Sequence, residues 1–130
     1  MRTLALLLLA ALAAPTWAQG LSLPAATWGS NWTTADTLRQ AAVTALLVVD
    51  WQQTRWAMEH PSKYREINSA LGESPSTGRL NNYTAISIVG HAAVSVLLPT
   101  EWRHGWQYVW IGIEAHTVYR NHKVGVRMEF

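Results

Sequence analysis

The fold is decided by residues 74–120, which read SPSTGRLNNYTAISIVGHAAVSVLLPTEWRHGWQYVWIGIEAHTVYR. The two apolar runs in this stretch are continuous rather than alternating, and they are long enough for helices. Serines at the start can cap a helix, and Pro99 cannot continue one. We therefore predict an antiparallel helical hairpin. Its first helix starts at Ser74-Pro75 or at Ser76 and runs to Leu98, a tight turn covers residues 100–104, and the second helix covers residues 105–120.

A long helix is predicted upstream of the hairpin, over residues 34–59. Thr33 or Thr34 can cap it, and Asp36 in the first turn complements the positive end of the helix dipole. No proline or glycine interrupts this range. Residues 60–80 are dense in proline, glycine, serine and charge, and are predicted to form a connector.

The N-terminus has the pattern of a secretory signal peptide. Arg2 precedes an apolar run, and the small residues Thr16 and Ala18 stand at the −3 and −1 positions of a cleavage site. An uncleaved N-terminal anchor is the alternative. The chain has no cysteine, which excludes a lipid-modified cysteine, a disulfide scaffold and thiolate chemistry.

The predicted fold class is all-α, with a signal peptide, a three-helix membrane bundle (long helix, connector, helical hairpin) and a short extended C-terminal tail. The tail is expected to be extended because its apolar and polar residues alternate. The predicted segments are a signal peptide over 1–18, an extended N-terminal segment over 19–33, a helical bundle domain over 34–122 and a tail over 123–130.

The charge distribution favours the bacterial inner membrane, with the periplasm as the alternative. If the mature N-terminus lies outside, the inner side carries more Lys and Arg than the outer side, in agreement with the positive-inside rule. The inner residues are Arg55, Lys63, Arg65, Arg79, Arg120, Lys123 and Arg127, and the outer ones are Arg39 and Arg103. The net charge is only +2, and no basic cluster indicates nucleic-acid binding.

Three ionisable residues interrupt the apolar runs: Asp50, His91 and Glu114. A charge in such surroundings is costly unless it is paired, solvated or functional. Counted from the predicted helix ends at a rise of about 1.5 Å per residue, the three lie at similar depth. We therefore expect them to face one bundle interior, with Thr54, Glu66 and Asn68 as neighbouring members of a polar cluster.

Three interpretations of this cluster remain open. Asp50, Glu66, His91 and Glu114 could ligate a divalent metal, or His91 could relay a proton with a carboxylate. Alternatively, the groups only hold the helices together: Asp50 pairs with Arg55 or Thr54, and His91 donates to Glu114. No tight metal-binding spacing, phosphate loop or nucleophile motif is present.

Most of the chain from Asp36 onward resembles a group of small membrane or exported proteins that are encoded in tailed-phage and prophage regions of proteobacteria. The residues that carry the resemblance are Asp50-Trp51-Gln52-Gln53-Thr54-Arg55, His60-Pro61, Tyr64, Glu66-Ile67-Asn68, Leu71-Gly72, Pro75-Ser76, Asn82-Tyr83, His91, Leu98-Pro99, Arg103 and Asn121. The resemblance implies a phage-associated membrane or exported protein and no particular activity.

The expected function is therefore that of a small non-enzymatic inner-membrane protein with an accessory role, such as superinfection exclusion or help with lysis. Its expected partners are the lipid bilayer and other membrane proteins or a second copy, with no cofactor. The alternative is a metal-dependent hydrolase that uses a divalent metal held by Asp50, Glu66, His91 and Glu114. A third interpretation is a periplasmic binding module that uses exposed tryptophans.

Overall fold

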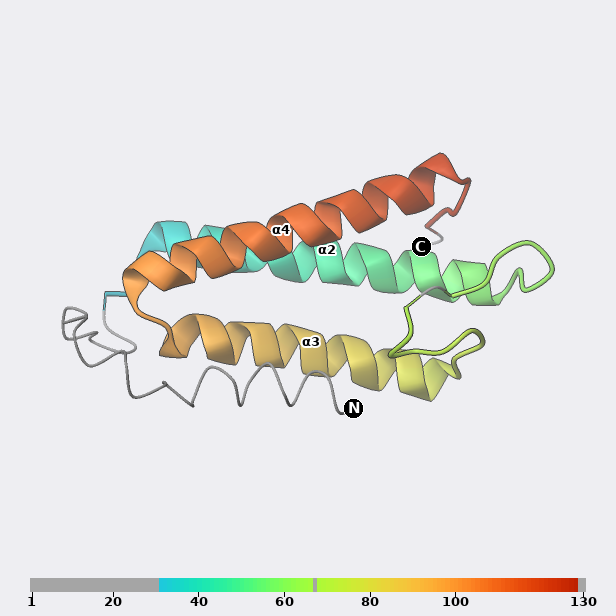
Figure 1. The fold of residues 1–130 in the computed structure, drawn as a ribbon, viewed down its shortest axis with the longest axis horizontal. Helices are drawn as coiled ribbons and strands as arrows, with labels where there is room; N and C mark the ends of the chain where they lie inside the picture. Colours follow the sequence, from blue (N-terminus) through green and yellow to red (C-terminus); the bar gives the residue numbers. More distant parts are fainter. Residues whose placement is uncertain (1–30, 67, 129–130) are drawn as a thin grey trace, which may run out of the picture.

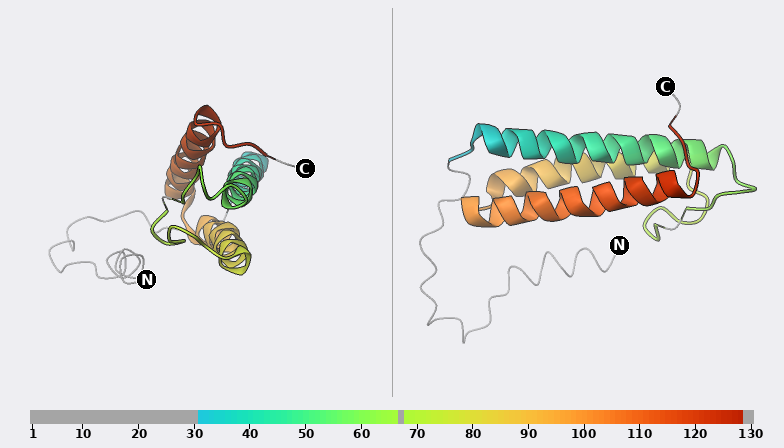
Figure 2. Two further views of the ribbon diagram at one scale, coloured as in Figure 1. Left: turned by 90° about the vertical axis from the view of Figure 1, so that its right-hand side faces the viewer. Right: turned by 90° about the horizontal axis from the view of Figure 1, so that it is seen from above.

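The computed structural model describes residues 31–66 and 68–128. These residues form three helices, α2 (Thr34–Met58), α3 (Thr77–Leu97) and α4 (Thr100–Lys123). Figure 1 shows α2 and α4 side by side along their length, and the end-on view in Figure 2 places the three helices at the corners of a triangle. The prediction of an all-α three-helix bundle is confirmed, and the described residues contain no strand. The predicted signal peptide, most of the segment over 19–33 and the end of the tail lie outside the described residues.

Both predicted helix starts are confirmed by their caps. The Thr33 hydroxyl accepts a hydrogen bond from the backbone N–H of Asp36, and the Asp36 carboxylate accepts one from the backbone N–H of Thr33, which completes a capping box. Ser76 caps α3 by accepting from the backbone N–H of Arg79. Each start therefore follows from local side-chain chemistry that the sequence displays.

The tight turn predicted over residues 100–104 is wrong, because these residues form the first turn of α4. Leu98 adopts an extended conformation before Pro99, as residues preceding proline prefer, and this ends α3. Pro99 then stands at the N-cap of α4, and its carbonyl accepts from the backbone N–H of Arg103. The hairpin therefore turns within two residues, Leu98 and Pro99, and α4 begins directly at Thr100.

The C-terminal end of α4 also differs from the prediction, since the helix continues to Lys123. Gly125 ends it with a φ of 89°, a left-handed conformation that glycine adopts without strain. The backbone N–H of Val126 donates to the Asn121 carbonyl, and the Val126 side chain is buried. The tail therefore folds back against the bundle instead of forming an isolated extended strand.

A membrane-spanning helix needs about 20 predominantly apolar residues. Within residues 31–66 and 68–128, no helix has the combination of length and hydropathy that crossing a membrane requires. The prediction of three membrane spans is therefore not supported by the described helices.

The interior of the bundle is unusually polar. The buried apolar side chains are Val43, Leu47, Leu71, Leu80 and Val126, whereas the buried polar or charged ones are Asp36, Gln53, Thr54, His91, Ser95, Arg103, Gln107 and Glu114. Buried polar groups are costly without hydrogen-bond partners. The two ends of the bundle differ more in how these polar groups are arranged than in how much apolar surface they bury.

At the Pro99 end, the side chain of Arg103 joins all three helices. It is completely buried, its Nε donates to the Ser95 carbonyl at 2.8 Å, and its Nη2 donates to the Leu98 carbonyl at 2.9 Å. Its Nη1 lies 3.4 Å from the carboxylate of Asp36 on α2. One guanidinium therefore fixes the C-terminus of α3 and the N-terminus of α2 against α4.

The Asp36 carboxylate is also completely buried and is surrounded by donors. Burial by itself would raise its pKa, but hydrogen bonds from Thr33 and Arg39 and the charge of Arg103 outweigh burial and hold the pKa well below its usual range. Gln107 Nε2 donates to the Asp36 carbonyl, and Gln107 Oε1 accepts from Arg39 Nε. This carboxylate is therefore ionised and fully compensated.

We predict that Arg103→Leu lowers the free energy of unfolding by about 3 to 5 kcal/mol, because it leaves Arg39 as the one arginine beside the buried Asp36 carboxylate and removes the donor of two carbonyls at the end of α3. Chemical denaturation followed by circular dichroism measures this loss. Arg65→Ala is the matched control, since Arg65 pairs with Glu73 at a site where both side chains are 78% exposed. The control should change stability by less than about 1 kcal/mol, and an equally small effect of Arg103→Leu would contradict the prediction.

Candidate functional site

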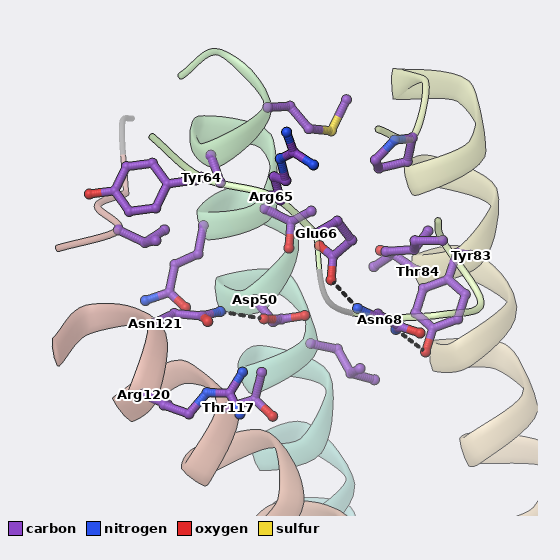
Figure 3. A pocket seen from close by; sticks show the side chains of 18 of the residues that line it. Asp50, Tyr64, Arg65, Glu66, Asn68, Tyr83, Thr84, Thr117, Arg120 and Asn121 are labelled. Atoms are coloured by element: carbon purple, nitrogen blue, oxygen red, sulfur yellow. Dashed lines mark hydrogen bonds between the residues drawn. The ribbon is translucent and has the colours of Figure 1, made fainter. Parts of the chain in front are cut away.

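The candidate site is a cavity of about 870 Å³ at the end of the bundle opposite Pro99. It lies between the second half of α2, the start of α3, the end of α4 and the connector (Figure 3). The side chains that carry its chemistry are Asp50, Gln53, Thr54, Tyr64, Arg65, Glu66, Asn68, Glu73, Tyr83, Glu114, Thr117, Arg120 and Asn121. Apolar side chains such as Leu47, Met58, Leu71 and Trp110 form the rest of its wall.

The cavity exists because α3 and α4 diverge from their short turn. These two helices contact each other least, whereas α2 contacts both. The connector fills part of the gap, and Asn68 shapes it: its carbonyl and side-chain oxygen accept backbone hydrogen bonds, and its Nδ2 donates to the Tyr83 hydroxyl at 2.9 Å. Figure 3 shows this bond at the cavity wall.

Two carboxyls, Asp50 on α2 and Glu114 on α4, lie within each other's electrostatic influence. Burial raises the pKa of Asp50 to about 6, and the charge of Glu66 adds to the rise, while a hydrogen bond from Asn121 opposes it. Burial also raises the pKa of Glu114 to about 7, with a further contribution from the charge of Asp50. Both carboxyls therefore change protonation state near neutral pH.

The hydrogen bonding of these carboxyls is sparse. Asp50 Oδ1 accepts from Asn121 Nδ2 at 3.0 Å, and Glu66 Oε1 accepts from the backbone N–H of Asn68 at 2.7 Å. Glu114 is 8% exposed, and no hydrogen bond to its carboxyl is formed within the described part of the chain. This contrasts with Asp36 at the other end of the same bundle.

Five of the six residues predicted to form a polar cluster meet at this cavity: Asp50, Thr54, Glu66, Asn68 and Glu114. His91 does not line it. The prediction counted Glu114 from His104, but α4 begins at Thr100, so Glu114 lies 14 residues into its helix while His91 lies 6 residues before the end of α3. Eight residues of helix separate the two levels by about 12 Å.

His91 instead packs in an aromatic pocket. Its ring stacks on Trp106 with a centroid distance of 5.3 Å and meets Trp110 edge-on at 5.6 Å. Neither ring nitrogen has a hydrogen-bond partner within residues 31–66 and 68–128, and burial lowers the pKa of His91 to about 4. His91 is therefore neutral at physiological pH. It does not donate to Glu114, so the interpretation in which His91 and Glu114 are hydrogen-bonded to each other is wrong.

Asp50 does not pair with Arg55 or Thr54, the two partners that were expected for it. Arg55 lies over the ring of Trp51, and the side chain that donates to Asp50 is Asn121. Sequence reasoning did not identify Asn121 or Gln53 as site residues. A helical polar stripe could have revealed them, since Arg103, Gln107, Glu114 and Asn121 recur at spacings of four and seven residues on one face of α4.

Within residues 31–66 and 68–128, no three His, Asp or Glu side chains come together in a way that could hold a metal ion. No protein-family model, curated protein or solved structure matches this chain. The chemistry of the cavity must therefore be inferred from its own residues.

We predict that Glu114→Gln stabilises the protein more at pH 8 than at pH 5, by about 2 kcal/mol. The folded-state pKa of about 7 exceeds the ordinary value of 4.5. The folded protein therefore holds this proton more tightly, and the resulting stability is complete below the ordinary pKa and lost as the pH rises through 7. Glutamine mimics the protonated form at every pH. Denaturation curves of both proteins at the two pH values test this, and an equal effect at both would contradict it.

We predict that His91→Phe changes the free energy of unfolding by less than about 1 kcal/mol, or increases it, since phenylalanine keeps the ring packing and removes two unpartnered nitrogens. Thermal unfolding at pH 7 measures the effect. A loss of more than about 3 kcal/mol would show instead that the imidazole nitrogens make an essential interaction.

Proposed function

We propose that the protein is a small non-enzymatic helical bundle attached to the bacterial inner membrane, where it has an accessory role. The observation that carries this proposal is the inverted distribution of polarity, with charged and amide side chains inside the bundle and large apolar side chains outside. Soluble proteins rarely expose large contiguous apolar surfaces unless these bind something. Proteins in lipid, in contrast, turn polar groups toward the bundle interior.

The exposed apolar side chains lie on all three helices, and together we call them the apolar belt. Ile86 and Val89 on α3 are 71% and 68% exposed, and Leu38 on α2 is 67% exposed. The other members are Val48, Val96, Leu97, Trp102, Tyr108, Val109, Ile113 and Tyr119. Along α3 the belt covers about 18 Å, shorter than the hydrocarbon layer of about 30 Å. Attachment through the belt does not require one helix to cross the bilayer by itself.

The basic residues support an orientation for this attachment. Arg55, Arg79, Arg120 and Lys123 are exposed near the connector end. At the Pro99 end, by contrast, Arg39 and Arg103 are engaged with Asp36. Anionic lipids of the cytoplasmic leaflet attract clustered basic residues. The proposed orientation therefore places the connector and the tail on the cytoplasmic side.

The accessory role in superinfection exclusion or lysis rests only on the resemblance to phage-encoded proteins. No separate observation favours the metal-dependent hydrolase, because the described part of the chain does not bring together the set of ligands that it needs. The helical bundle and its apolar belt are therefore the basis of the proposal, and membrane attachment is the part to test first.

We predict that the full chain stays in the membrane pellet after alkaline carbonate extraction and is released by detergent. Introducing charge into the belt with Ile86→Lys and Val89→Lys should shift a large part of the protein into the supernatant, because lysine is costly in the apolar layer. Immunoblotting of a C-terminally tagged copy measures the distribution.

Asn82→Lys is the matched control, since Asn82 is an exposed polar residue of the same helix. It should leave the distribution unchanged. Complete release of the unmodified chain by carbonate would overturn membrane attachment, and retention of the belt variant at the level of the unmodified chain would overturn the role of the belt.

A further inference from the structure

The cavity has hydrogen-bond acceptors without matching donors. Gln53 is 2% exposed, its Nε2 donates to the Val118 carbonyl at 3.3 Å, and its Oε1 has no partner among the described residues. The nearly buried Glu114 carboxyl accepts no hydrogen bond within the described part of the chain. These two side chains come from different helices and both line the cavity. The Gln53 oxygen is a buried acceptor in this state, which is costly unless a donor reaches it.

The cavity wall also carries more negatively charged groups than positively charged ones. Its wall holds four carboxyls (Asp50, Glu66, Glu73 and Glu114) and two guanidiniums (Arg65 and Arg120). Arg65 and Glu73 pair with each other at 3.4 Å on the outside. The remaining three carboxyls face one exposed arginine, and no ion pair joins any of the three to a cation among the described residues.

The other end of the bundle shows how this protein compensates a buried carboxylate. Asp36 receives hydrogen bonds from Thr33 and Arg39 and lies beside Arg103. Among the described residues, Asp50 receives one hydrogen bond, from Asn121, and the Glu114 carboxyl receives none, although Asp50 is half-buried and Glu114 is buried. A ligand that brings positive charge and N–H donors would supply hydrogen bonds to both carboxyls.

An organic ammonium group matches this cavity better than a metal ion. Within the described part of the chain, no three His, Asp or Glu side chains come together to hold a metal ion, whereas the three N–H donors of a primary ammonium can be satisfied by two carboxyls and one amide oxygen. The tyrosines at positions 64 and 83, together with Met58 and Trp110, provide aromatic and apolar surface for a hydrocarbon stem. The volume of about 870 Å³ is ample for a short aliphatic amine.

We propose that the cavity binds the primary ammonium group of a small aliphatic amine, with Asp50, Glu114 and Gln53 as its acceptors. The binding site does not depend on membrane attachment, so the two proposals stand or fall separately. Asp50 and Glu66 are only partly buried, which gives a small solute access to the acceptors from the connector end.

Binding of the ammonium is coupled to proton release. The raised pKa values of Asp50 and Glu114 mean that both carboxyls are largely protonated at pH 5, when they attract a cation weakly. At pH 8 both are ionised, and binding should be at least about tenfold tighter. The titratable and charged groups that face them are Glu66, Glu73, Arg65 and Tyr64 on the connector, Tyr83 on α3 and Arg120 on α4.

Isothermal titration calorimetry of the full chain in mild detergent with 1,4-diaminobutane tests the proposal. We expect saturable binding with one site per chain at pH 8 and low salt. Glu114→Gln should weaken it by about tenfold or more, since one charge-assisted hydrogen bond is lost. Asp50→Asn provides a second variant, and circular dichroism of both variants confirms that the fold is retained.

Glu101→Gln is the matched control, because Glu101 is an exposed glutamate in the first turn of α4 and its replacement removes the same charge far from the cavity. It should leave the affinity unchanged. Tetramethylammonium, which has no N–H donor, should bind at least tenfold more weakly than the diamine.

Several results would overturn the proposal. These are an absence of saturable diamine binding at pH 8, an affinity unaffected by both cavity variants, and binding of Mg²⁺ at the cavity without binding of the amine. Membrane retention in the carbonate experiment has no bearing on any of them.

Discussion

The buried pair of Arg103 and Asp36 is the constraint on which the arrangement of the three helices depends. The guanidinium of Arg103 binds carbonyl groups at the end of α3 and the Asp36 carboxylate at the start of α2. A buried ion pair contributes little net stability, but breaking it leaves an uncompensated charge. The pair therefore fixes which helix ends meet, and the short turn at Pro99 then determines how α4 leaves that junction.

The two ends of the bundle differ in how far their carboxylates are compensated. Near Pro99, donors on α2 and α4 surround Asp36 and keep it ionised. At the connector end, α3 and α4 have diverged, and Asp50 and Glu114 face a cavity in which donors are few. Carboxyl groups thus hold the helices together at one end of the bundle, and at the other end they line a site that is rich in hydrogen-bond acceptors.

The apolar belt and the cavity share one residue, Ile113, and otherwise consist of different side chains. The belt is made of exposed side chains on the three helices, and the cavity opens near the connector, so the two proposed roles depend on largely separate groups. A bundle with a conventional apolar interior would have neither feature, because its large apolar side chains would fill the space that polar groups and the cavity occupy here.

The sequence by itself determined the helices and most of their ends, because caps at Thr33 and Ser76 and the break at Pro99 act locally. It also indicated that Asp50, Glu66, Asn68 and Glu114 would meet, since polar residues in apolar runs must face inward. Only the tertiary structure decided that His91 lies elsewhere and that Gln53 and Asn121 belong to the site. Helix register depends on where α4 begins, and an error of five residues at the turn displaces a side chain by about 7.5 Å along the helix axis. Asp36 finds Arg39 on its own helix, but Arg103 reaches Asp36, and Asn121 reaches Asp50, from a different helix, so local sequence does not specify these partners.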